Sequence, residues 1–135
     1  MGSWWRNIEW PVRRRVLAVG LSSAWGLAVR LCLRRLPLAR LAWRPVARPW
    51  LHASPAQVRR ALERVPPSLL GPSACLVRAV AAQQILAVCG VNARVVLATV
   101  RPPSAQSSFC AHAWIETDGQ QCDPAPWVVL ARVEP

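Results

Sequence analysis

The stretch ACLVRAVAAQQILAVCG, residues 74–90, decides the fold because it predicts the helix around which the remaining elements are arranged. Ser73 is a suitable N-cap for this helix, and Gly90 stands where a C-terminal glycine cap belongs. The helix between them has about fifteen residues, which is above the ordinary minimum for a stable helix. Cys75 therefore falls in the first turn of the helix.

The sequence after this helix changes to the composition of β-structure. Residues 93–101, ARVVLATVR, are rich in β-branched side chains and predict a strand. Residues 109–116 predict a second strand, and residues 121–124 predict a third that pairs with it across a tight turn. Residues 126–133 predict one more strand. Helices followed by antiparallel strands indicate an α+β fold.

Two further helices are predicted upstream of residue 74. Residues 13–35 predict a helix that is apolar on most sides and has arginines at both ends. Residues 36–53 contain three prolines and predict an irregular linker or short turns. Ser54 and Gln57 then form the pattern of a capping box, with proline at the first helical position between them. This helix should end before Pro66.

The whole chain has a formal net charge of +11, and its positive charge is concentrated in the N-terminal part. Residues 1–50 contain ten arginines, one glutamate and six of the eight tryptophans. We therefore divide the chain into a basic, Trp- and Arg-rich helical arm, residues 1–53, and a core, residues 54–135. An anionic partner would meet the arm. Packing of the arm over the core or a partner protein is the simpler interpretation, and contact with a membrane surface is the alternative.

The arm does not have the pattern of a membrane span or of a cleaved signal. Its uncharged run, residues 16–29, is too short to cross a bilayer and is followed by Arg30. No clear A-x-A cleavage site follows. The five cysteines are an odd, scattered set without a CxxC pair, which argues against a disulfide framework and a standard zinc ribbon. We expect reduced thiols in a cytoplasmic protein.

The turn between residues 116 and 121 predicts which acidic residue can meet His112. If Asp118 and Gly119 are the central residues of a two-residue turn, Asp123 lies across from Trp114. Because side chains alternate along a strand, His112, Trp114 and Glu116 share one face. Asp123 would then lie on that face, diagonally from His112. Asp118, at the tip of the turn, would be too far away.

The residue types at these positions suit nucleophilic catalysis by a thiol. A cysteine at a helix N-terminus is stabilised as thiolate by the helix dipole and by exposed backbone amides, which can also bind an oxyanion. Cys75 is therefore a better nucleophile candidate than Cys110, which lies on the predicted strand. With His112 as base and Asp123 orienting it, Cys75 completes a Cys-His-Asp triad. The rival interpretation is a zinc site made by Cys75, Cys110 and His112, which lacks an obvious fourth ligand.

The segments CLVR, residues 75–78, and AHAWIETDG, residues 111–119, together resemble the lasso-peptide leader peptidases. These are small transglutaminase-like (papain-like) cysteine proteases that form the C-terminal half of the lasso-peptide B protein. The resemblance covers about residues 54–127 and implies a nucleophile helix packed on a small antiparallel sheet. It places the nucleophile at Cys75 and the histidine at His112. The third member would be Asp123, where members of the family vary.

The resemblance also implies a reaction and a set of partners. The substrate would be a ribosomally made precursor peptide, cut between leader and core before a separate lasso cyclase acts. A separate leader-recognition protein would deliver the precursor, and no cofactor and no nucleic acid are expected. Hydrolysis and transfer of the acyl group to an amine pass through the same cysteine thioester, so the residue types do not separate them. The resemblance favours hydrolysis. A non-catalytic module that binds a membrane or nucleic acid through the arm is the alternative from another class.

Overall fold

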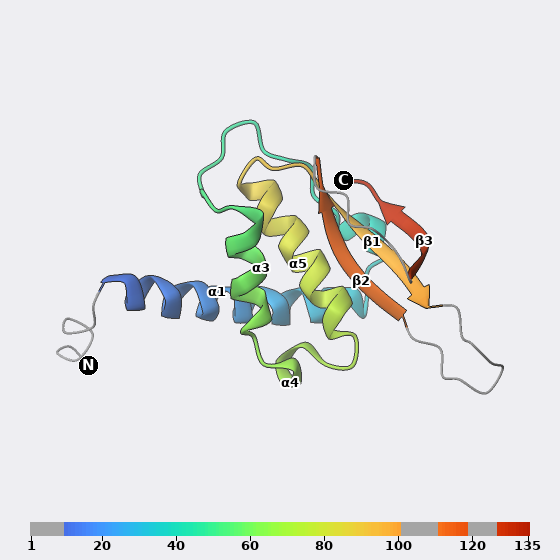
Figure 1. The fold of residues 1–135 in the computed structure, drawn as a ribbon, viewed down its shortest axis with the longest axis horizontal. Helices are drawn as coiled ribbons and strands as arrows, with labels where there is room; N and C mark the ends of the chain where they lie inside the picture. Colours follow the sequence, from blue (N-terminus) through green and yellow to red (C-terminus); the bar gives the residue numbers. More distant parts are fainter. Residues whose placement is uncertain (1–9, 101–110, 119–126) are drawn as a thin grey trace.

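The computed structural model describes residues 10–100, 111–118 and 127–135. Within these ranges helices come first and strands last, and Figure 1 shows α1, α3 and α5 packed beside a small antiparallel sheet. The elements are α1 (Trp10–Leu33), α2 (Leu38–Leu41), α3 (Pro55–Glu63), α4 (Pro67–Leu70), α5 (Ala74–Val88), β1 (Ala93–Val100), β2 (Ala111–Thr117) and β3 (Trp127–Val133). The predicted α+β fold is confirmed.

The start of α3 has the predicted capping box. The Ser54 hydroxyl oxygen accepts a hydrogen bond from the Gln57 backbone N–H, and the Gln57 side-chain oxygen accepts one from the Ser54 N–H at 2.8 Å. These bonds satisfy amide donors that the helix itself leaves free. The helix ends before Pro66, as predicted. Beyond it, Pro67 occupies the first position of the short helix α4, which was not predicted.

The end of α5 is set by a glycine in the left-handed region. Gly90 has a φ of 75°. Its N–H donates to the Ala87 carbonyl, and the Val91 N–H donates to the Leu86 carbonyl at 2.8 Å. This pair of bonds is a Schellman motif, which explains why a residue without a side chain stands at position 90. The predicted glycine cap is confirmed.

The sheet has β1 at its centre, with β2 and β3 antiparallel to it on either side. Ala98 of β1 lies opposite both His112 of β2 and Val129 of β3, next to a register shift in the β1–β3 pairing. The strand predicted at 126–133 is confirmed as β3. The predicted hairpin partner of β2, residues 121–124, lies outside the described residues, so that register remains a prediction.

Helix α5 is buried because it lies between the other helices and the sheet. It contacts α1 and α3 on one side and β1 and β2 on the other. A helix whose residues are mostly apolar is stable in such a position, where most of its surface is buried. Its buried side chains join those of the neighbouring elements in one core, which includes Leu62, Leu70, Val77, Val80, Ala81, Leu86, Val95 and Ala113.

Two buried glutamines of α5 hold the segment that follows α1. The Gln83 amide donates to the carbonyls of Trp43 and Ala93 and accepts from the Trp43 N–H, so both backbone polar groups of Trp43 are satisfied. The Gln84 amide donates to the Leu41 carbonyl and accepts from Trp25 Nε1 at 2.8 Å. Buried polar groups need such partners, and these bonds fix the segment against the core. The segment is not irregular throughout, since residues Leu38–Leu41 form the short helix α2.

Helix α1 packs across α3, α4 and α5 through one face. Val29 on that face is buried, and Trp25 packs against the core. Gly26 allows close approach, since a Cβ atom there would lie 2.7 Å from a Leu70 methyl carbon. In the part of the chain that the structure describes, no helix is long and apolar enough to cross a membrane. The division at residues 53 and 54 remains a prediction, although α1 and the core are in direct contact.

Candidate active site

Cys75 is the second residue of α5 and its thiol is half-buried against the core. Its position in the first turn is the predicted one. Arg78, one turn further along the helix, donates hydrogen bonds to the carbonyls of Leu62 and Val65 at 3.1 and 3.0 Å. This arginine ties the end of α3 to the start of α5 and thereby fixes the position of the helix end that carries the thiol.

The N-terminus of α5 is open in a way that the sequence did not predict. Ser73 occupies the N-cap position, but its side chain makes no capping hydrogen bond. Its ψ of 36° departs from the extended conformation in which an N-cap oxygen reaches the first turn. The first hydrogen bond of the helix runs from the Val77 N–H to the Ser73 carbonyl, so the N–H groups of residues 74–76 have no partner within the helix. Such amides favour a thiolate and can bind a developing oxyanion.

His112 is the second residue of β2 and is exposed. Its ring lies tilted against two tryptophan rings, with centroid distances of 5.0 Å to Trp127 of β3 and 5.9 Å to Trp114 of β2. Ala113 and Ile115 pack into the core shared with α5, so alternation places His112 on the other face of the strand. The predicted common face of His112, Trp114 and Glu116 agrees with these contacts.

The structure brings Cys75 and His112 to adjoining elements without a direct bond between them. Helix α5 contacts β2, and in Figure 1 both begin toward the same end of the sheet. Among the described residues no hydrogen bond joins the Cys75 thiol to the His112 ring, whose contacts there are with the tryptophans. Asp123 and Cys110 lie outside the described residues, so their predicted places in the triad and the zinc site stay predictions.

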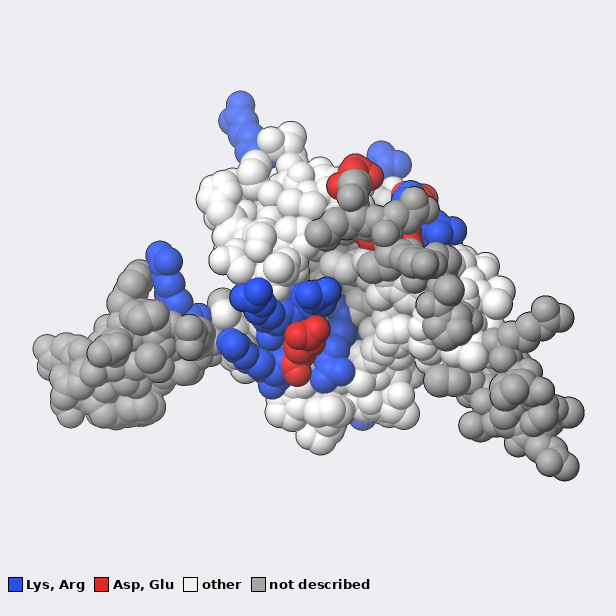
Figure 2. Space-filling model, viewed as in Figure 1, with Lys and Arg blue, Asp and Glu red and all other residues white. Residues whose placement is uncertain are grey.

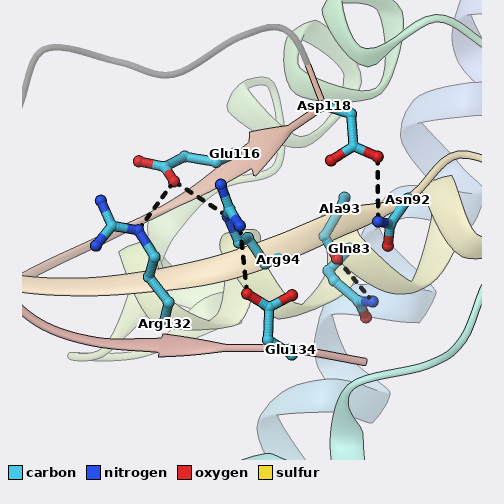
Figure 3. A network of polar contacts seen from close by, with 8 residues as sticks. All are labelled: Gln83, Asn92, Ala93, Arg94, Glu116, Asp118, Arg132 and Glu134. Carbon is cyan, nitrogen blue, oxygen red and sulfur yellow. Dashed lines mark hydrogen bonds and ion pairs between the residues drawn. The ribbon is translucent and has the colours of Figure 1, made fainter.

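Glu116, on the same face as His112, is the centre of an ion-pair network across three strands (Figure 3). Its carboxylate is almost fully buried and accepts from Nε of both Arg94 and Arg132, each at 3.2 Å. Arg94 also pairs with Glu134 at 3.3 Å. The hydrogen bond to Glu134 is the main cause that holds the pKa of Arg94 above its usual value, and the bond to Glu116 adds to it. This network fastens β2 and the chain end to β1.

Asp118 lies in the turn after β2, where it was predicted, and takes part in local structure. Its carboxylate accepts a hydrogen bond from the Asn92 side chain at 3.2 Å, next to the start of β1 (Figure 3). Since Asp118 is six residues beyond His112 on an extended strand, its carboxylate is too distant to orient the imidazole. Within the described ranges, no group of three or more His, Cys, Asp or Glu residues is placed to hold a metal ion.

The contacts of Trp127 and of the two buried glutamines were not predicted from the sequence. Trp127 was placed in a strand, but its stacking on His112 depends on β3 lying two strands away across β1, which no local pattern shows. Gln83 and Gln84 stand in a helix with few other polar residues, and that isolation was a signal for buried hydrogen bonds.

These features define a class of α+β protein in which a cysteine opens a central helix beside an antiparallel sheet that carries a histidine. Residues 17–133 match the transglutaminase-like superfamily, so the chain belongs to that superfamily. The match includes Cys75, His112 and most of α1. No curated protein and no solved structure was found to match the chain.

Proposed function

We propose that the protein is a cysteine peptidase that removes the leader from a lasso-peptide precursor. The observation that carries this proposal is the position of Cys75 at the open N-terminus of α5, inside the region that matches the superfamily. His112 on the contacting strand supplies the base. The CLVR and AHAWIETDG segments support the lasso-specific substrate by their resemblance to leader peptidases.

In this reaction His112 takes the Cys75 proton, and the thiolate attacks the carbonyl carbon at the leader–core junction. A C–S bond forms, the peptide C–N bond breaks, and the imidazolium gives its proton to the departing core amine. Water, deprotonated by His112, then attacks the thioester and releases the leader with a free carboxylate. The amides of residues 74–76 hold the negative oxygen in both steps.

Because His112 lies on the face of β2 opposite the core residues Ala113 and Ile115, this chemistry requires its ring to turn around the edge of the sheet and come within hydrogen-bond reach of the Cys75 sulfur in the substrate complex. Catalytic hydrogen bonds are often long in the free enzyme and tighten when substrate binds. Asp123 is our candidate for the residue that orients His112. A separate leader-recognition protein would raise the local concentration of precursor, and a lasso cyclase would consume the freed core.

The test is cleavage of a purified lasso precursor in the presence of its leader-recognition protein, followed by mass spectrometry. We expect Cys75→Ala, Cys75→Ser and His112→Ala to abolish leader removal, and Asp123→Ala to lower the rate strongly in a folded protein. Cys32→Ala is the matched control, since Cys32 is an exposed free thiol on α1. Cys110→Ala and Asp118→Asn should also cleave normally. Normal cleavage by the Cys75 variants would refute the mechanism.

The same assay separates hydrolysis from amine transfer. With an added primary amine in excess, a hydrolase releases a leader with a free carboxylate, whereas a transferase releases the amide. The masses of the two products differ, so the acceptor is read directly. Loss of cleavage in Cys110→Ala together with bound zinc in the purified protein would favour the metal site instead.

A further inference from the structure

Helix α1 has a second apolar face that the core does not cover. Its exposed leucines are Leu17, Leu21, Leu27 and Leu31, whose relative exposures are 57%, 71%, 41% and 54%. At 3.6 residues per turn these four positions fall within an arc of about 120°. We call this arc the leucine stripe.

The leucine stripe points away from the rest of the protein. Ser22 and Val29, which are buried at 6% and 3% exposure, lie on the opposite side of the helix and face the core. The residues between the leucines within the arc, Gly20, Ala24 and Ala28, are small and exposed. The N-terminal half of α1 also extends beyond the other elements, as Figure 1 shows. Continuous exposed apolar surface of this kind usually marks an interaction site.

Charge and composition indicate what covers the stripe. Arg34 and Arg35 are exposed just beyond its C-terminal end, and three consecutive arginines, residues 13–15, precede it. In Figure 2 most of the described surface is uncharged, and basic side chains, in blue, cover more of the visible face than acidic ones, in red. Two copies paired through this helix would bring like charges together, which opposes self-association. An anionic surface is attracted instead.

A lipid surface suits the stripe better than a protein partner does. The stripe is apolar throughout and lies on a convex helix, whereas protein interfaces usually carry hydrogen bonds that fix the register of the partner. Acyl chains need no such bonds. Arginines beside a leucine face, with tryptophans at positions 4, 5 and 10 of the sequence, are the composition of helices that lie in the membrane interface.

We therefore propose that the leucine stripe of α1 docks the protein on an anionic membrane surface, with the helix lying parallel to it. The leucine side chains enter the boundary between headgroups and acyl chains, and the flanking arginines contact lipid phosphates. The core, on the opposite side of α1, remains in water. The proposal does not depend on the catalytic role of Cys75.

The test is co-sedimentation of the full chain with vesicles of phosphatidylcholine, with and without phosphatidylglycerol. We expect binding to the anionic vesicles that weakens as salt is raised, and weak binding to the neutral ones. The double variant Leu17→Gln, Leu21→Gln should bind anionic vesicles about tenfold more weakly, because two leucines no longer enter the lipid. These are the two most exposed leucines of the stripe, so folding should be unchanged by circular dichroism.

Leu130→Gln is the matched control, since Leu130 on β3 is 60% exposed and lies outside the stripe. It should bind vesicles as the original protein does. Equal binding by the double variant, or no binding to anionic vesicles at all, would overturn the proposal. Self-association in sedimentation experiments that the double variant abolishes, without vesicle binding, would assign the stripe to a second copy and also overturn it. Vesicle binding by Cys75→Ala keeps this test separate from the test of catalysis.

Discussion

Replacing Glu116 with glutamine tests whether the ion-pair network of the sheet stabilises the fold. The glutamate side chain is 1% exposed, and both arginines that meet it are about one-third exposed, at 32% and 35%. Glutamine keeps the volume of the side chain but removes its charge. Arg94 and Arg132 would then face one neutral oxygen, and of the two only Arg94 has a second carboxylate, that of Glu134, among the described residues.

The magnitude follows from the geometry of the two bonds. A hydrogen bond to a charged group contributes about 1.5–3 kcal/mol, and Glu116 accepts two such bonds at 3.2 Å. Water reaches both arginines and screens part of this energy, and glutamine can still accept one bond. We therefore expect the free energy of unfolding to fall by about 2 kcal/mol.

The assay is urea unfolding followed by tryptophan fluorescence and circular dichroism. With a denaturant dependence of about 2 kcal/mol per M, the midpoint should fall by about 1 M urea. Glu63→Gln is the matched control, because Glu63 also pairs with an arginine, at 3.6 Å, but both side chains are more than half exposed. An exposed pair within one helix contributes about 0.3–0.5 kcal/mol, so this midpoint should barely move.

Equal midpoints for Glu116→Gln and Glu63→Gln would refute the reasoning, because burial of the carboxylate would then contribute nothing. A double-mutant cycle with Arg132→Met separates the pair from the rest of the network. If the loss caused by Glu116→Gln is unchanged when Arg132 is already absent, the two groups do not interact energetically. The stabilisation would then have to come from Arg94 alone.

Three further changes probe other parts of the structure. Gln84→Leu should lower the free energy of unfolding by about 2 kcal/mol in the same urea assay, since it leaves the buried Leu41 carbonyl and the half-buried Trp25 Nε1 without this hydrogen bond. Gly90→Ala should lower the free energy of unfolding by about 1 kcal/mol or more, because a φ of 75° strains any residue with a Cβ. Gly20→Ala, at a helical position with open space around it, should raise the free energy of unfolding slightly. Trp127→Ala removes the ring 5.0 Å from His112, and we expect a lower kcat for leader cleavage with folding intact; an unchanged kcat would show that this stacking does not position the base.

Local interactions explain why much of the fold could be predicted from the sequence. The capping box at Ser54 and the glycine at position 90 act within one turn of their own helix, so their effect can be recognised from neighbouring residues alone. Alternation along residues 111–117 likewise placed His112 and Glu116 on one face, since that period is a property of any strand. The same local reasoning placed Cys75 at the start of α5.

Local reasoning failed where a contact joins distant segments. Ser73 has the residue type of an N-cap, but the chain entering α5 from α4 sets a backbone conformation in which its side chain does not cap. The proline pair ended α3 as predicted, but the short helix α4, which begins at Pro67, was not predicted. Nothing near Glu116 in the sequence indicates that its carboxylate would meet Arg94 and Arg132 from two other segments.

The sequence by itself determined the order of the three long helices and of β1, β2 and β3, the helix ends that have local caps, and the presence of a thiol and an imidazole in suitable elements. Only the tertiary structure decided that β1 lies between β2 and β3, that the Trp127 ring stacks beside the His112 ring, and that one leucine face of α1 stays exposed. The physical reason is the range of the forces involved. Caps and periodicity act over a few residues. Strand order and helix packing depend instead on apolar surfaces that are far apart in the sequence and that bury each other from water.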